Sequence, residues 1–355
     1  MRDHGGDIYT HLERYGTTEE SIIDFSASIN PLGPPQSVLV EIEHHLDHVI
    51  HYPDSDARRL RSKISEAHNL DPASIVCGNG CTELIRLIPM ALGFKKVLIP
   101  SPTYSDYERA CRLANPGLTI IHHPLRKENL FDIDAEGLTH AMVNESVDAV
   151  FLCNPNNPTG RLIRKESLTK IAEAAKQHRV YLVVDESFID FCPSTESLIN
   201  NVETNLYLMV LRSMTKFYAL PGLRIGYGVF PAETAEALRA HQAPWSVNTL
   251  AQVAAIAALG ATGYREETLK IIGEQKKVLE QGFADLGIDF IPSVANYYLL
   301  AIPAAQQITA YLEHRGLLVR NCANFRGLNH AYLRVAVKSP NHNMLLLHYL
   351  EEYLG

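Results

Sequence analysis

The chain has 355 residues, of which 46% are hydrophobic, so it is long and apolar enough for one large domain with a sizeable core and a smaller domain beside it. Its formal net charge of −8 and its lack of basic runs argue against a nucleic-acid-binding protein. The longest apolar helical candidate, residues 250–259, is far too short to cross a membrane.

The N-terminal residues Met1-Arg2-Asp3-His4-Gly5-Gly6 lack the apolar stretch of a secretory signal. Six cysteines are scattered through apparent core and loops, which favours reduced thiols over a disulfide framework. They lie at positions 77, 81, 111, 153, 192 and 322. Both features predict a cytoplasmic protein.

Helices are expected at residues 37–46 and 57–67. Around the end of the first, His44, His45, His48 and His51 fall at helical spacing and raise a metal site as an alternative. No cysteine or paired carboxylate completes a ligand shell, and the apolar spacing indicates an amphipathic helix with its histidines facing water. We therefore expect no metal, although the sequence does not give segment 44–51 a role.

A glycine-containing loop, Gly78-Asn79-Gly80, leads into an expected helix at residues 83–92. Glycines let the backbone approach an anion, and the N–H groups at a helix start face the anion with the favourable sign of the helix dipole. We predict that Gly80, Cys81 and Thr82 bind a phosphate group. The alternatives are an ordinary strand-to-helix turn or a redox pair formed by the two cysteines that flank the loop.

Six strands alternate with helical segments in the manner of an α/β protein with a largely parallel sheet. They are expected at residues 96–99, 118–122, 149–153, 180–185, 206–211 and 224–229. The third runs into Asn154-Pro155-Asn156-Asn157, and the fourth ends in Asp185. Because ligands collect at the carboxyl ends of strands in such sheets, Asn157 and Asp185 are candidate ligand-binding residues.

The most informative stretch is Ser213-Met214-Thr215-Lys216, followed by Arg224 in a glycine-containing loop. A lysine amine can form a Schiff base with an aldehyde. Ser213, Thr215 and Arg224 supply donors for a dianionic phosphate, which arginine can grip through two oxygens. This combination predicts a pyridoxal phosphate (PLP) site, whereas Lys216 taken alone could be an ordinary surface lysine.

A PLP site also explains the two strand ends. A carboxylate at Asp185 would keep the pyridine nitrogen protonated, so that the ring can accept the electrons of a broken bond at the substrate's α-carbon. Asn157 could present its amide to the phenolic oxygen of PLP or to a substrate carboxylate. A helix cap or turn residue is the alternative for Asp185 alone, but the order Asn157, Asp185, Lys216, Arg224 favours the PLP site.

The C-terminal part begins after Pro244-Trp245 with a helical tract to about residue 286. Strands at 297–302 and 332–337 and helices at 306–315 and 341–354 follow. We expect residues 1–35 to form an N-terminal arm and part of the small domain. Residues 36–243 form the large PLP-binding domain, and residues 244–355 form an interdomain helix and the C-terminal small domain.

These motifs resemble the fold-type I, aspartate-aminotransferase-like PLP enzymes, in particular their histidinol-phosphate aminotransferase branch, and the resemblance runs nearly end to end. It implies the fold of PLP-dependent transferases, with a mostly parallel sheet in the large domain and a small α/β domain. Within the branch, the chain is most similar to the L-threonine O-3-phosphate decarboxylases of cobalamin biosynthesis. The segments that carry this likeness include 4–6, 24–33, 52–54, 78–83, 185–191, 211–218 and 244–248.

The resemblance also assigns residues that spacing alone does not. It implies that Tyr104 stacks on the pyridine ring and that Tyr52 crosses from one subunit of a homodimer to the cofactor phosphate of the other. It further implies substrate contacts from the small domain and the N-terminal segment. Those residues are His4, Gly6, Asn30, Arg320, toward the phosphate, and Arg334, at the end wall of the site.

Two features favour decarboxylation over transamination. Phe188 stands where the aminotransferase relatives usually carry a tyrosine that hydrogen-bonds the cofactor, and a phenyl ring cannot donate. His4-Gly5-Gly6 resembles the arm that closes over the substrate in the decarboxylases. The alternatives are a histidinol-phosphate-type aminotransferase, a decarboxylase that prefers L-serine O-phosphate, and a PLP-binding regulator without turnover. How a substrate lies between Arg320 and Arg334 is not determined by the sequence.

Overall fold

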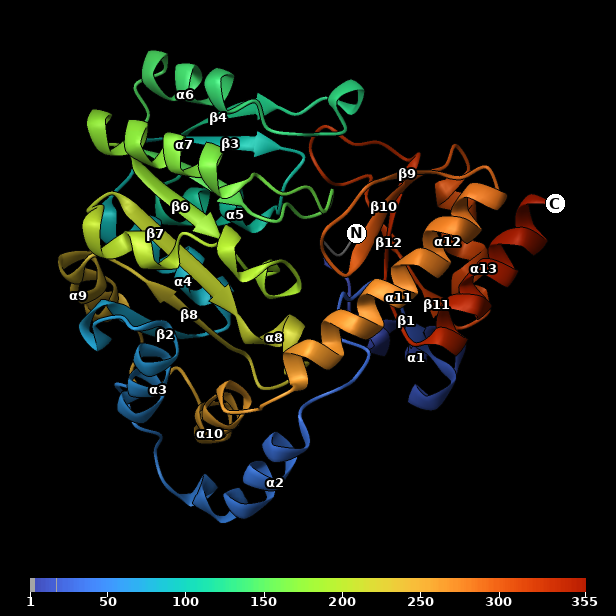
Figure 1. Ribbon diagram of the computed structural model, residues 1–355, viewed down its shortest axis with the longest axis horizontal. Coiled ribbons are helices and arrows are strands. Elements are labelled where there is room, and N and C mark those ends of the chain that lie inside the picture. The colour runs from blue at the N-terminus through green and yellow to red at the C-terminus, as the bar shows by residue number, and fades with distance from the viewer. Residues whose placement is uncertain (1–3, 17) are drawn as a thin grey trace.

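The computed structural model describes residues 4–16 and 18–355, which form a seven-stranded sheet, a four-stranded sheet and a two-stranded pair, with helices around the two larger sheets. The seven-stranded sheet lies on one side, and a four-stranded sheet lies on the other beside the C-terminal helices (Figure 1). The helix α11 (Tyr264–Asp285), 22 residues long, runs from the large sheet to the small one. The cavity described below lies between these two parts.

The large sheet has the strand order β2-β8-β7-β6-β5-β3-β4, and only β8 runs antiparallel to its neighbours. Its strands are β2 (Ile75–Asn79), β3 (Lys96–Ser101), β4 (Thr119–Pro124), β5 (Ala149–Cys153), β6 (Tyr181–Asp185), β7 (Leu208–Ser213) and β8 (Ile225–Val229). The central strands are continuous apolar runs because helices bury both faces of a parallel sheet.

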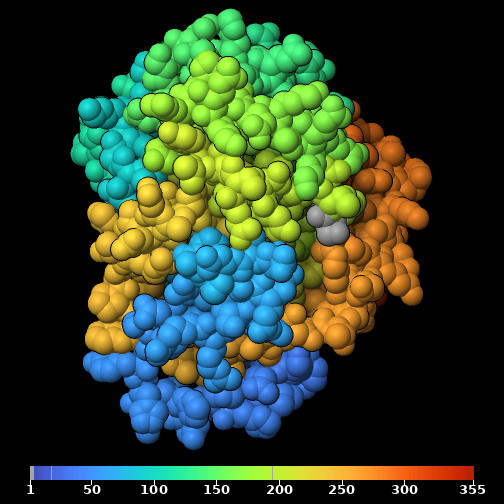
Figure 2. Space-filling model, turned by 60° about the vertical axis from the view of Figure 1, so that its left-hand side comes forward, coloured from blue at the N-terminus to red at the C-terminus, as the bar shows by residue number. Residues whose placement is uncertain are grey.

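One face of this sheet is covered by α4 (Cys81–Leu92), α5 (Asp106–Ala114) and α9 (Ala232–His241). The other face packs against α3 (Arg58–His68), α6 (Ala135–Asn144), α7 (Lys165–His178) and α10 (Thr249–Leu259). The helix α2 (Gln36–His44) packs on α10 at the edge of the molecule, and a short helix α8 (Met214–Phe217) follows β7. Figure 2 shows the segment around α2 and α3, in blue, at the foot of the molecule.

The small sheet is antiparallel and has the order β12-β13-β10-β9, made of β9 (Asp289–Ile291), β10 (Tyr297–Ala301), β12 (Arg320–Asn321) and β13 (Tyr332–Ala336). Helices α11, α12 (Ala305–His314) and α13 (Pro340–Leu354) pack against it around an apolar core. The N-terminal segment joins this part of the molecule, because β1 (Ile23–Asp24) pairs with β11 (Leu317–Leu318). The first helix, α1 (Ile8–Tyr15), lies on the same side (Figure 1).

The expected α/β class is confirmed, and every strand predicted above is present with shifts of a few residues at its ends. The helical tract expected up to residue 286 is wrong in one respect: it is two helices, because α10 ends at Leu259 and α11 starts after Gly263, whose φ of +76° is left-handed. The short strands β1, β9, β11 and β12 were not expected, since two or three residues carry no periodic signal.

Three observations concern the surface and the thiols. All six cysteines are buried and free, which agrees with the predicted reduced state. Across residues 4–16 and 18–355, no three or more histidine, cysteine or acidic side chains come together as a metal site would require. No helix in that same part of the chain combines the length and the apolar character needed to cross a bilayer.

Candidate active site

A cavity of about 450 Å³ lies between the two sheets and gathers most of the predicted site residues. Its wall is built from the carboxyl ends of β5, β6 and β7, from the start of α4, and from the β12–β13 pair of the small sheet. Twelve of the predicted residues line it: His4, Cys81, Thr82, Tyr104, Asn157, Asp185, Ser213, Thr215, Lys216, Arg224, Arg320 and Arg334. Residues that are far apart in the sequence therefore form one site.

One end of the cavity collects donors suited to an anion. Cys81 and Thr82 form the first turn of α4, and Ser213 and Thr215 flank the β7–α8 junction with their hydroxyls 2.8 Å apart. A side chain at Gly80 would place its Cβ 2.5 Å from the Arg224 Nη2 atom. The glycine thus leaves room for the guanidinium beside the helix start, where backbone N–H groups favour a phosphate.

Lys216 projects into the same cavity from the end of α8. Burial, together with the positive charges of Arg334 and Arg224, lowers the pKa of its amine to about 8. A lowered pKa raises the neutral fraction of the amine near pH 7, and the neutral amine is the form that attacks an aldehyde.

Asp185 lies at the end of β6, on the floor of the cavity. Its Oδ2 accepts a hydrogen bond from the Tyr107 hydroxyl at 2.7 Å, and its Oδ1 accepts bonds from Ser187 through the backbone N–H at 2.9 Å and the hydroxyl at 2.5 Å. Burial raises the pKa of Asp185, while these hydrogen bonds and the charge of Lys216 oppose the rise. The carboxylate is therefore held rigidly in a setting where a cationic partner would be strongly favoured.

The opposite wall carries two buried arginines that face each other across the β12–β13 pair, Arg320 and Arg334. Arg334 donates to Asn157 Oδ1 at 2.5 Å and to the Ser26 carbonyl oxygen at 2.7 Å. Arg320 donates to Asn324 Oδ1 at 2.7 Å. Two fixed guanidiniums in one wall can bind two anionic groups of a single ligand.

Four predicted residues do not line the cavity. Asn30 donates its side-chain amide to Phe217, Tyr264 and Thr268, and its backbone N–H bonds the Lys216 carbonyl oxygen. It is therefore placed to hold the lysine segment and not to contact a ligand in the cavity.

The other three residues lie outside the cavity wall. Gly80 lies beside the Arg224 guanidinium, and Gly6 donates its backbone N–H to Ser26 Oγ. Tyr52 is 78% exposed and stacks on Trp245, with ring centroids 4.4 Å apart.

The sequence reasoning missed several residues that shape this site. Tyr107 and Ser187, the two partners of Asp185, come from helix α5 and from the loop after β6. Asp106 also lines the cavity, and so do Arg86 and Arg109. No local signal marked Tyr107, because its hydrogen bond joins it to a residue 78 positions further along the chain.

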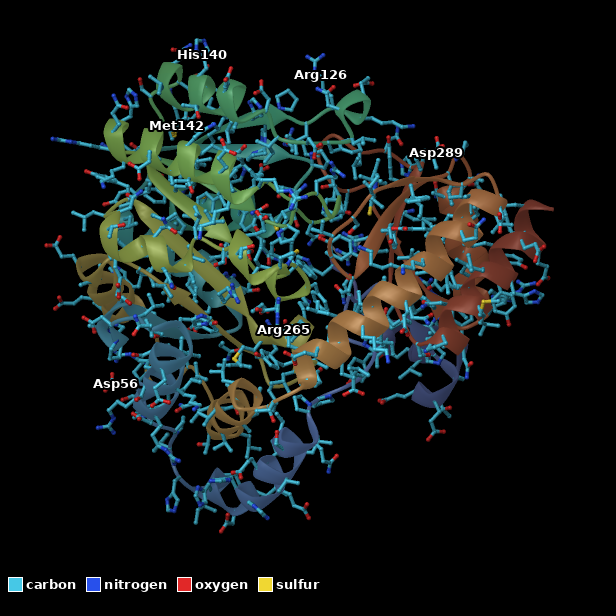
Figure 3. The ribbon with its side chains drawn as sticks, in the orientation of Figure 1. Asp56, Arg126, His140, Met142, Arg265 and Asp289 are labelled. Atoms are coloured by element: carbon cyan, nitrogen blue, oxygen red, sulfur yellow. The ribbon has the colours of Figure 1, made fainter. Side chains whose placement is uncertain are left out.

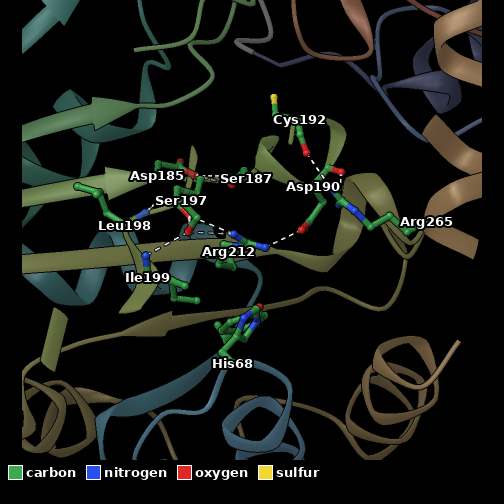
Figure 4. Close-up of polar contacts among 12 residues, drawn as sticks. His68, Asp185, Ser187, Asp190, Cys192, Ser197, Leu198, Ile199, Arg212 and Arg265 are labelled. Carbon is green, nitrogen blue, oxygen red and sulfur yellow. Dashed lines mark hydrogen bonds and ion pairs between the residues drawn. The ribbon is translucent and has the colours of Figure 1, made fainter. Parts of the chain in front are cut away.

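A buried ionic network lies beneath the site (Figure 4). Arg212, the residue before Ser213, donates to Glu186 Oε2 at 3.0 Å and to Asp190 Oδ1 at 2.5 Å. Arg265 at the start of α11 donates to the carbonyl oxygens of Asp190 and Cys192 at 2.6 and 2.5 Å. Figure 3 shows Arg265 where α11 meets the large domain. The network ties the Asp185 loop, the lysine loop and the interdomain helix together.

The residues present fit PLP. The anion end, Lys216 and Asp185 offer partners for its phosphate, aldehyde and pyridine nitrogen within one cavity. Two cavity residues also keep a buried polar atom without a hydrogen bond in the part of the chain that the structure describes, Ser28 Oγ and Arg334 Nε. Unpaired buried polar atoms are costly, so they indicate a site prepared for a polar ligand.

Comparisons with known proteins agree with this site. The family described as aminotransferase class I and II matches residues 20–351. The chain is 37% identical to a threonine-phosphate decarboxylase of Salmonella typhimurium, over 99% of this chain and 96% of the relative. It is 32% identical to the adenosylcobalamin biosynthesis bifunctional protein CobDQ of Leptospira interrogans, over 98% of this chain and 40% of that longer protein. The solved histidinol-phosphate aminotransferase from Clostridium acetobutylicum superposes with a TM-score of 0.86 at 32% identity, covering 93% of this chain and 98% of that chain.

Proposed function

We propose that this chain, which belongs to the class I and II aminotransferase family, is a PLP-dependent carboxy-lyase. Its substrate is L-threonine O-3-phosphate, and its products are (R)-1-amino-2-propanol O-2-phosphate and CO2, a step of cobalamin biosynthesis. The observation that carries the proposal is the cavity that joins Lys216 and Asp185 to two buried arginines on the facing wall. The threonine-phosphate decarboxylase among its relatives supports the choice of reaction and substrate.

PLP, when bound, supplies an aldehyde that links covalently to an amine and a ring that takes up electrons from a bond broken at the α-carbon. The chain's own residues do the rest. Cys81, Thr82, Ser213, Thr215 and Arg224 hold the phosphate, and Gly80 makes room for the arginine.

Lys216 and Asp185 hold the reactive ends of the cofactor. Lys216 would hold the aldehyde end of the cofactor through its amine, and a lysine at this point of the cavity would also be the group to return a proton to the α-carbon once the substrate's amine has taken its place. Asp185 keeps the pyridine nitrogen protonated, and Tyr107 and Ser187 keep its carboxylate oriented. We propose that Tyr104 packs on the ring, since it borders the cavity between Thr82 and Asp106.

The substrate carries a carboxylate and a phosphate, and the small domain offers one arginine for each. We propose that Arg334, which Asn157 and the Ser26 carbonyl oxygen hold in place, and Arg320 with His4 bind these two anionic groups between them. Binding both anions at fixed points sets which bond of the α-carbon is broken, because geometry at the reacting carbon decides the outcome. Phe188 borders the cavity without a hydroxyl, which favours decarboxylation over transamination.

The direct test measures CO2 released from L-threonine O-3-phosphate and from L-serine O-phosphate by the purified, PLP-loaded protein, with no oxo acid added. We expect release from the threonine compound and slower release from the serine compound. The two differ by one methyl group, which is worth about 1–3 kcal/mol in a fitted pocket. No release from either, together with amino transfer from histidinol phosphate to 2-oxoglutarate, would instead make the chain an aminotransferase.

We also propose a cytoplasmic homodimer with the domain division given above. The buried free thiols suit a reducing compartment. A strip of exposed apolar side chains around η2 (Leu46–Ile50) supports a subunit interface, and it ends at Tyr52 and Trp245. In this dimer Tyr52 reaches the cofactor phosphate of the other subunit.

A further inference from the structure

One carboxylate at the mouth of the cavity joins the N-terminal segment to the large domain. Asp106 Oδ1 lies 3.3 Å from His4 Nε2, and Asp106 Oδ2 accepts a hydrogen bond from the Tyr104 hydroxyl at 2.9 Å. The centroids of the His4 and Tyr104 rings lie 5.6 Å apart. Asp106 is only 7% exposed, and all three residues line the cavity. One oxygen of this carboxylate thus contacts the N-terminal segment, and the other contacts the large domain.

The His4–Asp7 segment follows a path that brings His4 to this point. A Cβ atom at Gly5 would collide with the carbonyl oxygen of Ser26, so only glycine fits there. Gly6 has a φ of +88° and donates its N–H to Ser26 Oγ at 2.8 Å. The segment is therefore built to lie flat against Ser26, next to the cavity.

The other end of this segment is fixed to the small domain. Asp7 caps helix α1 by accepting the Thr10 N–H at 3.2 Å. Helix α1 in turn contacts α12, because Arg14 Nη1 lies 3.1 Å from Glu313 Oε1. The His4–Asp106 contact is the matching attachment on the large domain. Together the two attachments carry the segment across the cleft between the domains.

Asp106 is more than an acidic residue at a helix start. It is the first residue of α5, where a negative charge is favoured by the helix dipole. Glu108 shares that first turn, but it faces Arg112, His122 and, at 3.7 Å, Arg326, and does not line the cavity. Burial acts to raise the pKa of Asp106, yet bonds from His4 and Tyr104 and the charge of Arg109 bring it below its ordinary value. The carboxylate is thus ionised and bonded to both His4 and Tyr104.

We propose that Asp106 is a positioning residue that fastens His4 over the cavity and aligns it with Tyr104, so that the His4–Asp7 segment covers the bound substrate. The proposal rests on the proposed function only for the identity of that substrate. Asp106 acts through its two partners and touches no reacting atom. Its loss should release the segment and weaken binding of the phosphorylated substrate.

The first test reads the segment directly and needs no turnover. Hydrogen exchange of the peptide covering residues 4–12 is measured in the PLP-loaded full chain for the parent, Asp106→Asn and Glu108→Gln. Glu108→Gln removes the same charge from the same helical turn without touching His4. We expect exchange about two- to five-fold faster in Asp106→Asn only, the size that a partly exposed ion pair supports. Equal exchange in all three proteins would overturn the proposal.

The second test is a double-mutant cycle on kcat/KM with L-threonine O-3-phosphate, using His4→Ala, Asp106→Asn and the double variant. If Asp106 works through His4, the double variant loses no more activity than the worse single variant, the loss is mainly in KM, and Asp106→Glu recovers part of it. Multiplying losses would mean that Asp106 serves Tyr104 alone, which contradicts the proposal. If even the parent releases no CO2, the proposed function fails, while the exchange result still decides the role of Asp106.

Discussion

At the scale of single residues, the site depends on one amine. Lys216 is the only lysine among the described residues that line the cavity, so no second lysine there can bind the cofactor in its place. We expect Lys216→Ala to lose the absorption band of lysine-bound PLP and to lose CO2 release by several orders of magnitude, because a nucleophile is removed outright. Absorption spectra before and after dialysis check this. A variant that keeps the parent band would place the covalent link on another residue.

The pH dependence of cofactor loading follows from the pKa of about 8 for Lys216, which lies below its ordinary value. The attacking form is the neutral amine, so the initial rate of recombination of the apoprotein with PLP should rise with pH and level off above about pH 8 to 9. An unperturbed lysine would keep gaining rate up to about pH 10.5. Stopped-flow absorption from pH 6.5 to 10 distinguishes the two curves. A rate that still rises steeply at pH 10 would contradict the lowered pKa.

Gly80 offers a sharper test of the anion end. Gly80→Ala combines backbone strain at a φ of +71° with a Cβ atom 2.5 Å from Arg224 Nη2. Gly93 at the other end of α4 has a φ of +63° with open space around it, so Gly93→Ala carries the strain alone. Gly93→Ala should lose about 1–2 kcal/mol of stability, and Gly80→Ala should lose more, because its ψ of 165° lies in a region that only glycine readily adopts. Only Gly80→Ala should weaken PLP binding, by about tenfold or more. Equal PLP dissociation constants in the two variants would exclude Gly80 from the phosphate site.

At the scale of elements, the sequence predicted the strands that a local hydrophobic pattern marks. Residues 149–153 and 180–185 are apolar runs of strand length that end in polar residues, and both became central strands whose ends carry Asn157 and Asp185. The sequence did not predict Tyr107 as a partner of Asp185, since the two residues lie 78 positions apart and meet only in the folded chain. The family resemblance predicted that Asn30 contacts the substrate. Its side chain instead donates hydrogen bonds to Phe217 and Thr268, which places it beside the lysine segment.

The network around Arg212 shows how neighbouring elements are locked below the site. Arg212→Met would leave Glu186 buried without its charge partner, which costs about 3–5 kcal/mol of unfolding free energy. Arg164 makes an exposed pair with Glu196, and Arg164→Met should cost less than about 1 kcal/mol. Chemical denaturation of both variants measures the difference. Adding Glu186→Gln should recover part of the loss in Arg212→Met, and the absence of any recovery would count against the ion pair as its cause.

At the scale of the whole molecule, exposed apolar side chains on the face around η2 need a partner. Ile50 is 80% exposed and lies near Tyr52 in the chain, while Leu206, 70% exposed, lies in the turn before β7. Isolated apolar side chains are normal on a surface, but a cluster that also includes Leu46, Val49 and Trp245 supports the proposed interface. The proposed dimer would bury this cluster and bring Tyr52 to the neighbouring cofactor.

Charge substitutions test that arrangement. Ile50→Asp places an unpaired charge in the proposed interface, so sedimentation velocity should show it shifting toward monomer and PLP titration should show at least tenfold weaker binding. Leu206→Asp is the matched control and should leave both mass and PLP affinity at parent values. Tyr52→Phe should keep the dimer but weaken PLP binding about tenfold or more, because it removes one hydrogen bond to a charged group. If Ile50→Asp remains dimeric, or if Tyr52→Phe binds PLP as tightly as the parent, the shared site is wrong and each subunit holds its cofactor with its own residues.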